Sequence, residues 1–351
     1  MKKIYTDKFR SSYKCECGVL IERVDQIQFG EEDDMEVKFP RSYIDLNLKE
    51  FVAEDLFSDR IYRKKRCVKC KGVLPSKVGV VPTFKIAFLG MKGSGKTVYS
   101  LALEQVMKGM NQSHFAKQEN ISLHIIMNDT VRYRQRETMM NNFNIGVLPE
   151  PTRNLNREFH IPFEIHNEST KTDAILLLYD LPGEITNHTI NRASNVSEAD
   201  VLFYMIDGSK LNETDLLYNK ECFRNILCSL KKRIPVYLIV TKIDLFTGYS
   251  VDRIRYGNNV LENSLENGKT NAMINVIGYD ETLVEANGKY AKYLLDHTGT
   301  DLYQDLESIM PKEMIYFFAV SAYSPTGGCF GVDLPLMHFL AQKSLIPYKE
   351  E

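Results

Sequence analysis

The chain has 351 residues, of which 44% are hydrophobic and 26% charged, and its formal net charge at pH 7 is -2. This length allows two domains, or one large domain with a smaller one attached. The near-neutral charge excludes a global field that would draw the chain to nucleic acid or an anionic membrane. No apolar stretch approaches the roughly 20 residues that a membrane-spanning helix needs. The N-terminus is polar from Lys2 and lacks the apolar core of a signal peptide, so we expect a cytoplasmic protein.

Four of the seven cysteines form two pairs near the N-terminus. Cys15 and Cys17 belong to Cys-Glu-Cys-Gly, and Cys67 and Cys70 belong to Cys-Val-Lys-Cys-Lys-Gly. The second pair has the spacing of a zinc knuckle, whereas the first pair is one residue short of it. Together they supply four thiolates, the ligand set of a structural, tetrahedral Zn²⁺ ion. The sequence therefore predicts a zinc site at these cysteines, and the alternative is two unrelated thiol pairs.

The spacing of the two cysteine pairs predicts a zinc-ribbon-like module over residues 1–80 that carries a large insertion. The insertion contains an acidic run at residues 31–34 and a basic run at residues 63–66, each most simply a solvated surface. A basic run beside a zinc knuckle leaves nucleic acid open as a partner. The lack of interleaved basic and aromatic residues argues against it. Glycines and prolines over residues 71–83 predict a linker.

The most informative stretch is Gly90 to Thr97, Gly-Met-Lys-Gly-Ser-Gly-Lys-Thr, which fits the phosphate-binding (Walker A) pattern G-x-x-x-x-G-K-[ST]. An apolar run precedes it and a helical pattern follows, as this loop requires. Its glycines let backbone N–H groups surround phosphates, and the helix N-terminus faces the same anion. We predict that Lys96 reaches the β- and γ-phosphates and that Thr97 offers its hydroxyl to Mg²⁺. The predicted nucleotide contacts here are Gly90, Lys92, Gly93, Ser94, Gly95, Lys96, Thr97 and Val98.

The next elements lead to a second metal ligand. Apolar spacing predicts a helix to about Lys108, a short strand or buried segment over 121–127 and an exposed, arginine-rich helix over 129–142. Residues 158–166 alternate between apolar and polar, which predicts a half-buried strand, and Pro162 places that strand at a sheet edge.

A continuous apolar run over 174–180 predicts a buried strand. It ends in Asp180-Leu-Pro-Gly183. A carboxylate at the end of such a strand, downstream of a phosphate loop, can hold Mg²⁺. The backbone N–H of Gly183 can meet the γ-phosphate. The pattern D-x-x-G is weak alone, but in this context it predicts Asp180 as a Mg²⁺ ligand together with Thr97.

Two further strand ends indicate which base is bound. A strand over 235–240 ends in Thr241-Lys242-Ile243-Asp244, and a last strand over 314–320 ends in Ser321-Ala322. The Asp244 carboxylate can accept both N1–H and N2–H of guanine, a donor pair that adenine lacks. The stem of Lys242 would lie along the base, and a backbone N–H at Ser321-Ala322 would meet guanine O6.

These motifs resemble, in their order and at their strand ends, those of the Ras-like (translation-factor-related) P-loop GTPases over about residues 84–345. The resemblance implies an α/β fold: a mixed, mostly parallel six-stranded sheet with helices on both faces and a Mg²⁺–GTP site in the crevice at the strand ends. It implies a GTPase domain over 81–351, with insertions at about 111–150 and 246–312. It also implies a switch threonine that senses Mg²⁺ and the γ-phosphate, for which we favour Thr152 over Thr130 and Thr138.

More narrowly, the cysteine pairs with this domain resemble bacterial zinc-ribbon GTPases of the double-GTPase type, which are linked to conflict or defence gene clusters. Thr241 stands where asparagine is commoner, but threonine occurs in subfamilies. Lys92 replaces a glycine and either stabilises phosphate charge or points to solvent. Glu184 replaces a water-orienting glutamine, and its charge predicts that intrinsic hydrolysis either is slow or uses another group. Nearby arginines are either surface residues, which we favour, or built-in arginine fingers: Arg153, Arg157 and Arg192.

The expected function is a GTP-binding molecular switch with slow GTP hydrolysis, acting with an unidentified protein effector or activating protein. The expected catalytic residues are Lys96, Thr152, Gly183 and Glu184. Insertion 246–312 is either an effector surface or helical decoration. Two other classes stay open. One is a P-loop ATPase or small-molecule kinase, against which the guanine motif argues. The other is a scaffold or nucleic-acid module whose nucleotide is only structural.

Overall fold

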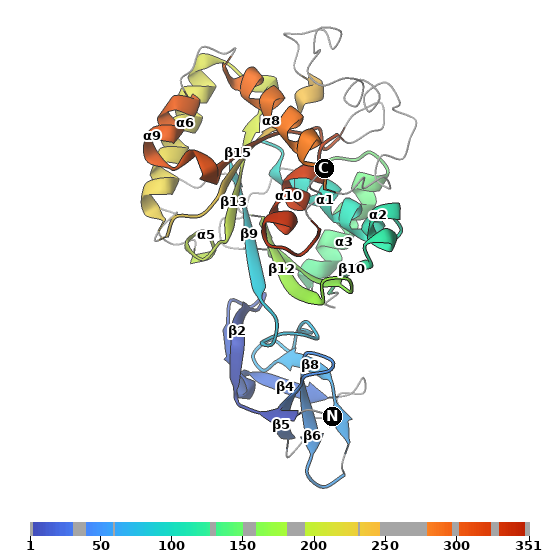
Figure 1. The fold of residues 1–351 in the computed structure, drawn as a ribbon. Coiled ribbons are helices and arrows are strands. Elements are labelled where there is room, and N and C mark those ends of the chain that lie inside the picture. Colours follow the sequence, from blue (N-terminus) through green and yellow to red (C-terminus); the bar gives the residue numbers. More distant parts are fainter. Residues whose placement is uncertain are drawn as a thin grey trace.

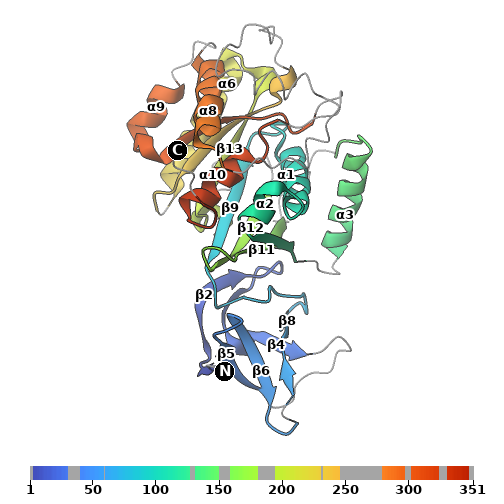
Figure 2. The same ribbon diagram turned by 45° about the vertical axis from the view of Figure 1, so that its right-hand side comes forward.

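The computed structural model describes residues 3–30, 40–58, 60–126, 131–149, 159–180, 194–230, 232–245, 279–296, 302–323 and 330–347. In these parts of the chain a seven-stranded, mostly parallel sheet carries helices on both faces, and a group of short strands lies at one end of it (Figure 1). The short strands are formed by the N-terminal residues, and β9 follows them in the chain as the first strand of the central sheet (Figures 1 and 2).

The central sheet has the strand order β10-β11-β12-β9-β13-β14-β15. Strands β12, β9, β13, β14 and β15 are parallel, and β10 and β11 are antiparallel additions at one side. The parallel strands are almost wholly buried because helices cover both faces, which explains their continuous apolar runs. The strands are β9 (Thr83–Gly90), β10 (Ile121–Ile125), β11 (Phe159–Asn167), β12 (Thr172–Asp180), β13 (Val201–Asp207), β14 (Val236–Thr241) and β15 (Ile315–Ala319).

Two expectations about this sheet are wrong. The sheet has seven strands rather than six, because β10 pairs beyond β11. The strand that contains Pro162 therefore lies inside the sheet. The β10 pairing ends at Phe163, and the Pro162 carbonyl accepts a hydrogen bond from Ile126 N–H on the β10 side. Since N and C=O of one strand residue face the same side, the missing N–H of proline falls where β10 ends and costs no bond to β12.

Helices pack on the two faces of the sheet around two apolar cores. Helices α1, α2, α3 and α10 share one core with the sheet, and α6 and α9 with most of α8 share the other. The helices are α1 (Lys96–Met110), α2 (His114–Gln118), α3 (Val131–Asn144), α5 (Ser194–Ser197), α6 (Glu213–Ser229), α8 (Glu281–Asp296), α9 (Leu302–Ile309) and α10 (Leu334–Gln342). Short 3₁₀ turns are η1 (Val24–Gln26), η2 (Gly208–Lys210), η3 (Ile243–Leu245) and η5 (Lys312–Met314).

The N-terminal residues form three small antiparallel sheets, β1-β5-β6-β7, β2-β3 and β4-β8. Their core is continuous with the apolar core on the α6 side of the central sheet. The strands are β1 (Lys3–Tyr5), β2 (Lys8–Lys14), β3 (Leu20–Arg23), β4 (Ile27–Gly30), β5 (Pro40–Asp45), β6 (Glu50–Asp55), β7 (Ile61–Tyr62) and β8 (Lys64–Cys67).

The predicted linker over residues 71–83 is packed rather than free. Leu74, Val78 and Val81 are buried in the core that the N-terminal strands share with the sheet. The buried Lys65 Nζ donates to the carbonyls of Ser76 at 2.6 Å and Arg63 at 3.0 Å. Burial lowers the pKa of Lys65 to about 8. Glycine and proline here mark tight turns, and the apolar residues between them anchor those turns.

A cluster of ion pairs fastens the N-terminal strands to the β11–β12 hairpin. Asp173 at the start of β12 is bound by Lys49 Nζ at 2.6 Å, by Lys77 Nζ and by His166 Nδ1 at 2.6 Å. Beside it, Glu164 accepts the Ser76 hydroxyl at 2.9 Å and the backbone N–H of Lys77 at 3.0 Å. His166 is thus a half-buried member of this cluster.

Asp173→Asn is expected to lower the free energy of unfolding by roughly 2 kcal/mol at pH 7, because it removes the carboxylate shared by two lysines. Burial alone would raise the pKa of Asp173, but the hydrogen bonds from Lys49, Lys77 and His166 outweigh it and lower the pKa to about 2. The stabilisation is therefore present above a pH of about 4 and is lost as the pH falls toward 2.

Urea denaturation at pH 7 and pH 3 checks this prediction, since the difference between wild type and Asp173→Asn should shrink at the lower pH. The matched control is Glu168→Gln, because exposed Glu168 also pairs with His166, at 2.8 Å. An exposed pair contributes about 1 kcal/mol or less. Equal losses for the two variants would show that the Asp173 cluster does not fasten the N-terminal strands.

Candidate functional site

The sequence motifs meet at one edge of the central sheet. Gly90 ends β9, Asp180 ends β12 and Thr241 ends β14, while Ser321 follows β15. The strands are parallel and adjacent, so their carboxyl ends share one edge. Strand β9 lies between β12 and β13, which are consecutive strands in the chain. The strand order therefore reverses at β9. The loop after β9, at this reversal, faces the crevice in which such sheets bind ligands.

The phosphate-loop backbone depends on its glycines. Gly90, Gly93 and Gly95 have φ values of 139°, 82° and 84°, in the left-handed region that side chains disfavour. A Cβ on Gly90 would also lie 2.4 Å from the carbonyl oxygen of Met205, on neighbouring β13. A Cβ on Gly93 would meet nothing within 4 Å, so its backbone angle alone requires glycine.

The side chain of Lys96 lies inside this loop. It is 7% exposed, and its Nζ donates to the carbonyls of Gly90 and Met91, each at 2.8 Å. Burial lowers the pKa of Lys96 to about 8, against the opposing effect of the Asp180 charge. A buried ammonium ringed by loop backbone provides a site for an anion such as a phosphate. Lys92 is exposed on the outer side of the same loop.

Thr97 and Asp180 lie together beside the loop. The Thr97 hydroxyl is hydrogen-bonded to the Asp180 carboxylate. Burial raises the pKa of Asp180, while the charges of Arg136 and Lys96 and the Thr97 hydrogen bond lower it. A hydroxyl and a carboxylate are oxygen ligands of the kind that Mg²⁺ takes beside phosphates, so this pair fits the predicted metal.

The residues at the end of β14 lie against the phosphate loop. The Thr241 hydroxyl is 2.8 Å from the Ser94 carbonyl and 3.1 Å from the Ile206 carbonyl, and it donates to one of them at a time. Lys242, at φ 55°, pairs through Nζ with Asp207 Oδ2 at 2.7 Å. Asp207 ends β13, and no sequence pattern near Asp207 indicates that Lys242 is its partner.

Asp244 and Ser321 meet across the ends of β14 and β15. The Ser321 hydroxyl donates to Asp244 Oδ1 at 2.6 Å. Ahead of them, the buried amide of Asn287 on α8 bonds both the N–H and the C=O of Ala319 at 2.9 Å. Asn287 thus fixes the strand end that carries Ser321-Ala322. A polar residue in the buried stripe of an amphipathic helix is the signal that could have indicated it.

Several predicted site residues lie outside the described residues: Thr130, Thr152, Arg153, Arg157, Gly183, Glu184 and Arg192. Their roles therefore stay predictions. Thr138, the other alternative to Thr152, lies on the exposed side of α3, where its hydroxyl donates to the Arg134 carbonyl at 2.9 Å.

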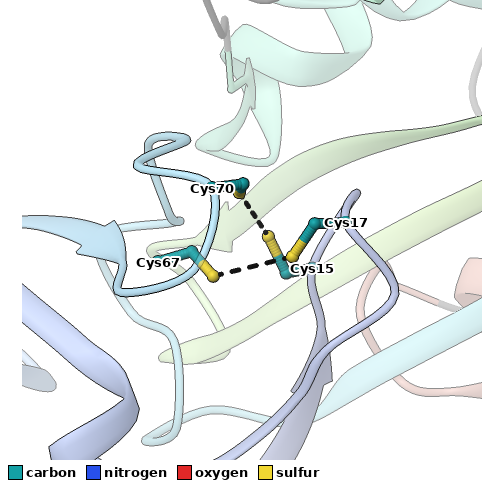
Figure 3. A group of neighbouring side chains, drawn as sticks. All are labelled: Cys15, Cys17, Cys67 and Cys70. Carbon is teal, nitrogen blue, oxygen red and sulfur yellow. Dashed lines mark hydrogen bonds between the residues drawn. The ribbon is translucent and has the colours of Figure 1, made fainter.

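The four N-terminal cysteines converge from two loops (Figure 3). Their Sγ atoms lie within 4.8 Å of one another, with Cys15–Cys70 at 3.5 Å and Cys17–Cys67 at 3.8 Å. A tetrahedral Zn²⁺ with Zn–S bonds of about 2.3 Å places its sulfurs about 3.8 Å apart. The donors and their spacing therefore fit such an ion.

Each cysteine pair sits on a tight turn. Gly18 N–H donates to the Cys15 carbonyl at 2.8 Å, with Gly18 at φ 83°. In the second loop Lys71 N–H donates to the Cys67 carbonyl at 2.8 Å, with Lys71 at φ 60°. The first turn is one residue shorter, and this explains how Cys-Glu-Cys presents both thiols despite its spacing.

Among the described residues, no helix combines the length and the apolar character needed to cross a membrane. No family model matches the chain, and no curated protein matches it.

Solved structures overlap with the chain in part. They include a signal recognition particle receptor complex, SRb-GTP/SRX, from Chaetomium thermophilum (15% identity, TM-score 0.36, 75% of this chain and 98% of that one). A mammalian signal recognition particle receptor gives 12% identity, TM-score 0.35 and coverages of 74% and 98%. The Ski7 GTPase-like domain of S. cerevisiae, bound to GDP and inorganic phosphate, gives 14% identity, TM-score 0.38 and coverages of 77% of this chain and 51% of that one. These TM-scores are too low to carry an assignment.

Proposed function

We propose that the chain is a Mg²⁺-dependent GTP-binding switch of the Ras-like class that slowly hydrolyses GTP to GDP and phosphate. The observation that carries this proposal is the meeting, at one sheet edge, of three features. They are a phosphate loop around a buried lysine, a hydroxyl–carboxylate pair beside it, and the Asp244–Ser321 pair at the ends of β14 and β15. Under this proposal residues 81–351 are the GTPase domain, and residues 1–80 are a zinc-ribbon-like docking module.

Each group has a role in the proposed site. Lys96 and the loop N–H groups bind the phosphates, and Thr97 and Asp180 hold Mg²⁺, which when bound neutralises phosphate charge. Asp244 selects guanine, with Lys242 along the base. Asp207 pairs with Lys242, and Thr241 bonds the loop, so both position the base-binding residues. Hydrolysis then depends on positioning and charge stabilisation rather than on covalent chemistry.

The switch itself would use residues outside the described parts. Thr152 would sense Mg²⁺ and the γ-phosphate, and Gly183 would meet the γ-phosphate through its N–H. Loss of the γ-phosphate would release the segment that contains Thr152 and the segment that follows Asp180. Glu184 in place of glutamine supports slow turnover without a partner. From the resemblance we further propose a protein effector and a role in a bacterial conflict or defence system.

Competitive binding of GTP, GDP and ATP in the presence of Mg²⁺ tests the proposal. We expect guanine nucleotides to bind wild type at least about 100-fold more tightly than ATP, since adenine lacks the donor pair that the Asp244 carboxylate would accept from guanine. Asp244→Ala should abolish this preference, while Glu313→Ala, an exposed carboxylate ahead of β15, should not change it.

Two outcomes would favour other functions. Equal binding of ATP and GTP by wild type would favour the ATPase or kinase class. Tight GTP binding with no phosphate release over hours would favour a nucleotide-stabilised scaffold.

A further inference from the structure

Helix α3 carries a charged residue within its buried stripe. Among residues 133–144 of this helix, the buried ones recur at helical spacing: Tyr133, Arg136, Met140 and Phe143. An exposed helix was predicted here, and the structure instead packs this stripe against the α1 side of the sheet. Arg136 is only 5% exposed. A buried arginine among apolar neighbours needs partners that repay its lost hydration.

Those partners are on α1. Arg136 Nε donates to Glu104 Oε2 at 3.1 Å, and Nη2 donates to the Ser100 hydroxyl at 2.6 Å. The other carboxylate oxygen of Glu104 pairs with Lys108 Nζ at 2.9 Å. The carboxylate of Glu104 therefore pairs with two cations, Arg136 and Lys108.

The same face of α1 leads to the metal end of the candidate site. Thr97, Ser100 and Glu104 are spaced i, i+3 and i+7, which places them on one side of the helix. Ser100, which Arg136 contacts, is therefore about one helical turn, or roughly 5 Å, from Thr97. Thr97 is hydrogen-bonded to Asp180. Burial raises the pKa of Asp180, and the positive charges of Arg136 and Lys96 lower it. The charge of Arg136 has the larger effect of the two.

We propose that Arg136 is a positioning residue that favours the triphosphate over the diphosphate at the neighbouring site. Glu104 and Ser100 hold its guanidinium about one turn below the metal-binding hydroxyl, and its positive charge acts on the additional negative charge of the γ-phosphate. At an effective dielectric constant of about 20, charges about 10 Å apart interact enough to change affinity severalfold. This inference rests on the proposed GTP-binding function.

The test is the ratio of the dissociation constants of GDP and a non-hydrolysable GTP analogue, with Mg²⁺. Arg136→Gln should lower the preference for the triphosphate by about tenfold. Glu104→Gln should raise it, since it removes the opposing negative charge. Arg136→Lys keeps the charge and should stay within about twofold of wild type. Arg134→Gln, on the exposed side of the same helix, is the matched control.

A purely structural role predicts a different result. If Arg136 only docked α3 on α1, Arg136→Gln and Glu104→Gln would weaken both nucleotides equally, and an unchanged ratio would overturn the inference. If Arg136→Gln does not fold, Glu104→Gln decides alone, and a ratio that falls or stays constant is the contrary result. Failure of the proposed function is distinguishable, because wild type itself would then not bind guanine nucleotides.

Discussion

Lys96→Ala is expected to lower the affinity for GTP and GDP by at least about 100-fold. The charged hydrogen bonds between an ammonium and phosphate oxygens contribute about 1.5–3 kcal/mol each, and two of them account for this loss. The structure supports a large effect, since Lys96 is the buried cation inside the loop and already directs its donors at loop carbonyls. Phosphate oxygens bound in the loop would compete for the same ammonium.

Titration with a fluorescent GDP analogue measures this loss. The matched control is Lys92→Ala, which removes the other loop lysine, and we expect less than about a fivefold change because Lys92 is exposed and solvent screens its charge. The pair of variants also decides whether Lys92 stabilises phosphate charge. Binding by Lys96→Ala within fivefold of wild type would mean that residues 90–97 do not hold phosphates.

The elements that the sequence predicted best are those whose signal is local. A buried parallel strand is a continuous apolar run, and β9, β12 and β14 were recognised in that way. The residues after these strands meet because parallel strands end at one edge, so their proximity follows from the topology. The P-loop, Asp180 and the guanine motif were therefore found together without knowledge of any side-chain contact.

The residues that were missed have distant partners. Arg136 and Glu104 are 32 residues apart, as are Asn287 and Ala319, and Asp207 and Lys242 are 35 apart. No local pattern encodes such pairs. A polar residue within an otherwise apolar helical stripe does give a signal, since the helix must bury it against something. The seventh strand was ambiguous because its five residues, Ile-Ser-Leu-His-Ile, are too few to distinguish a short strand from a buried segment.

Removal of metal from the four-cysteine cluster is expected to unfold the N-terminal strands. Each of these strands is short, at most seven residues, and the two cysteine loops are joined by no disulfide. The sulfur separations of 3.5 Å and 3.8 Å exceed the roughly 2.05 Å of an S–S bond. A metal ion that all four sulfurs bind fits this spacing and would join the two loops. Structural Zn²⁺ sites contribute on the order of 10 kcal/mol to folding in small domains.

Metal analysis of the purified protein should give one Zn²⁺ per chain. Cys67→Ser should lower that content severalfold and make the N-terminal strands sensitive to protease, as should a strong chelator acting on wild type. Cys228→Ser is the control, because this thiol is exposed on α6 and is not one of the four clustered cysteines. Metal-free wild type with unchanged protease resistance would show that the cluster is only a pair of thiol pairs.

Chelation also tests whether the cysteine cluster and the nucleotide site affect each other. The cysteines belong to the strands next to the amino end of β9, while the phosphate loop follows its carboxyl end (Figures 1 and 2). Chelation would release the hold of Lys49 and Lys77 on Asp173, at the far end of β12 from Asp180. We therefore expect GDP affinity, measured after chelation with Mg²⁺ restored, to change by less than about threefold, as for sites without shared contacts. A larger loss would mean that β12 transmits the state of the N-terminal strands to the metal-binding carboxylate.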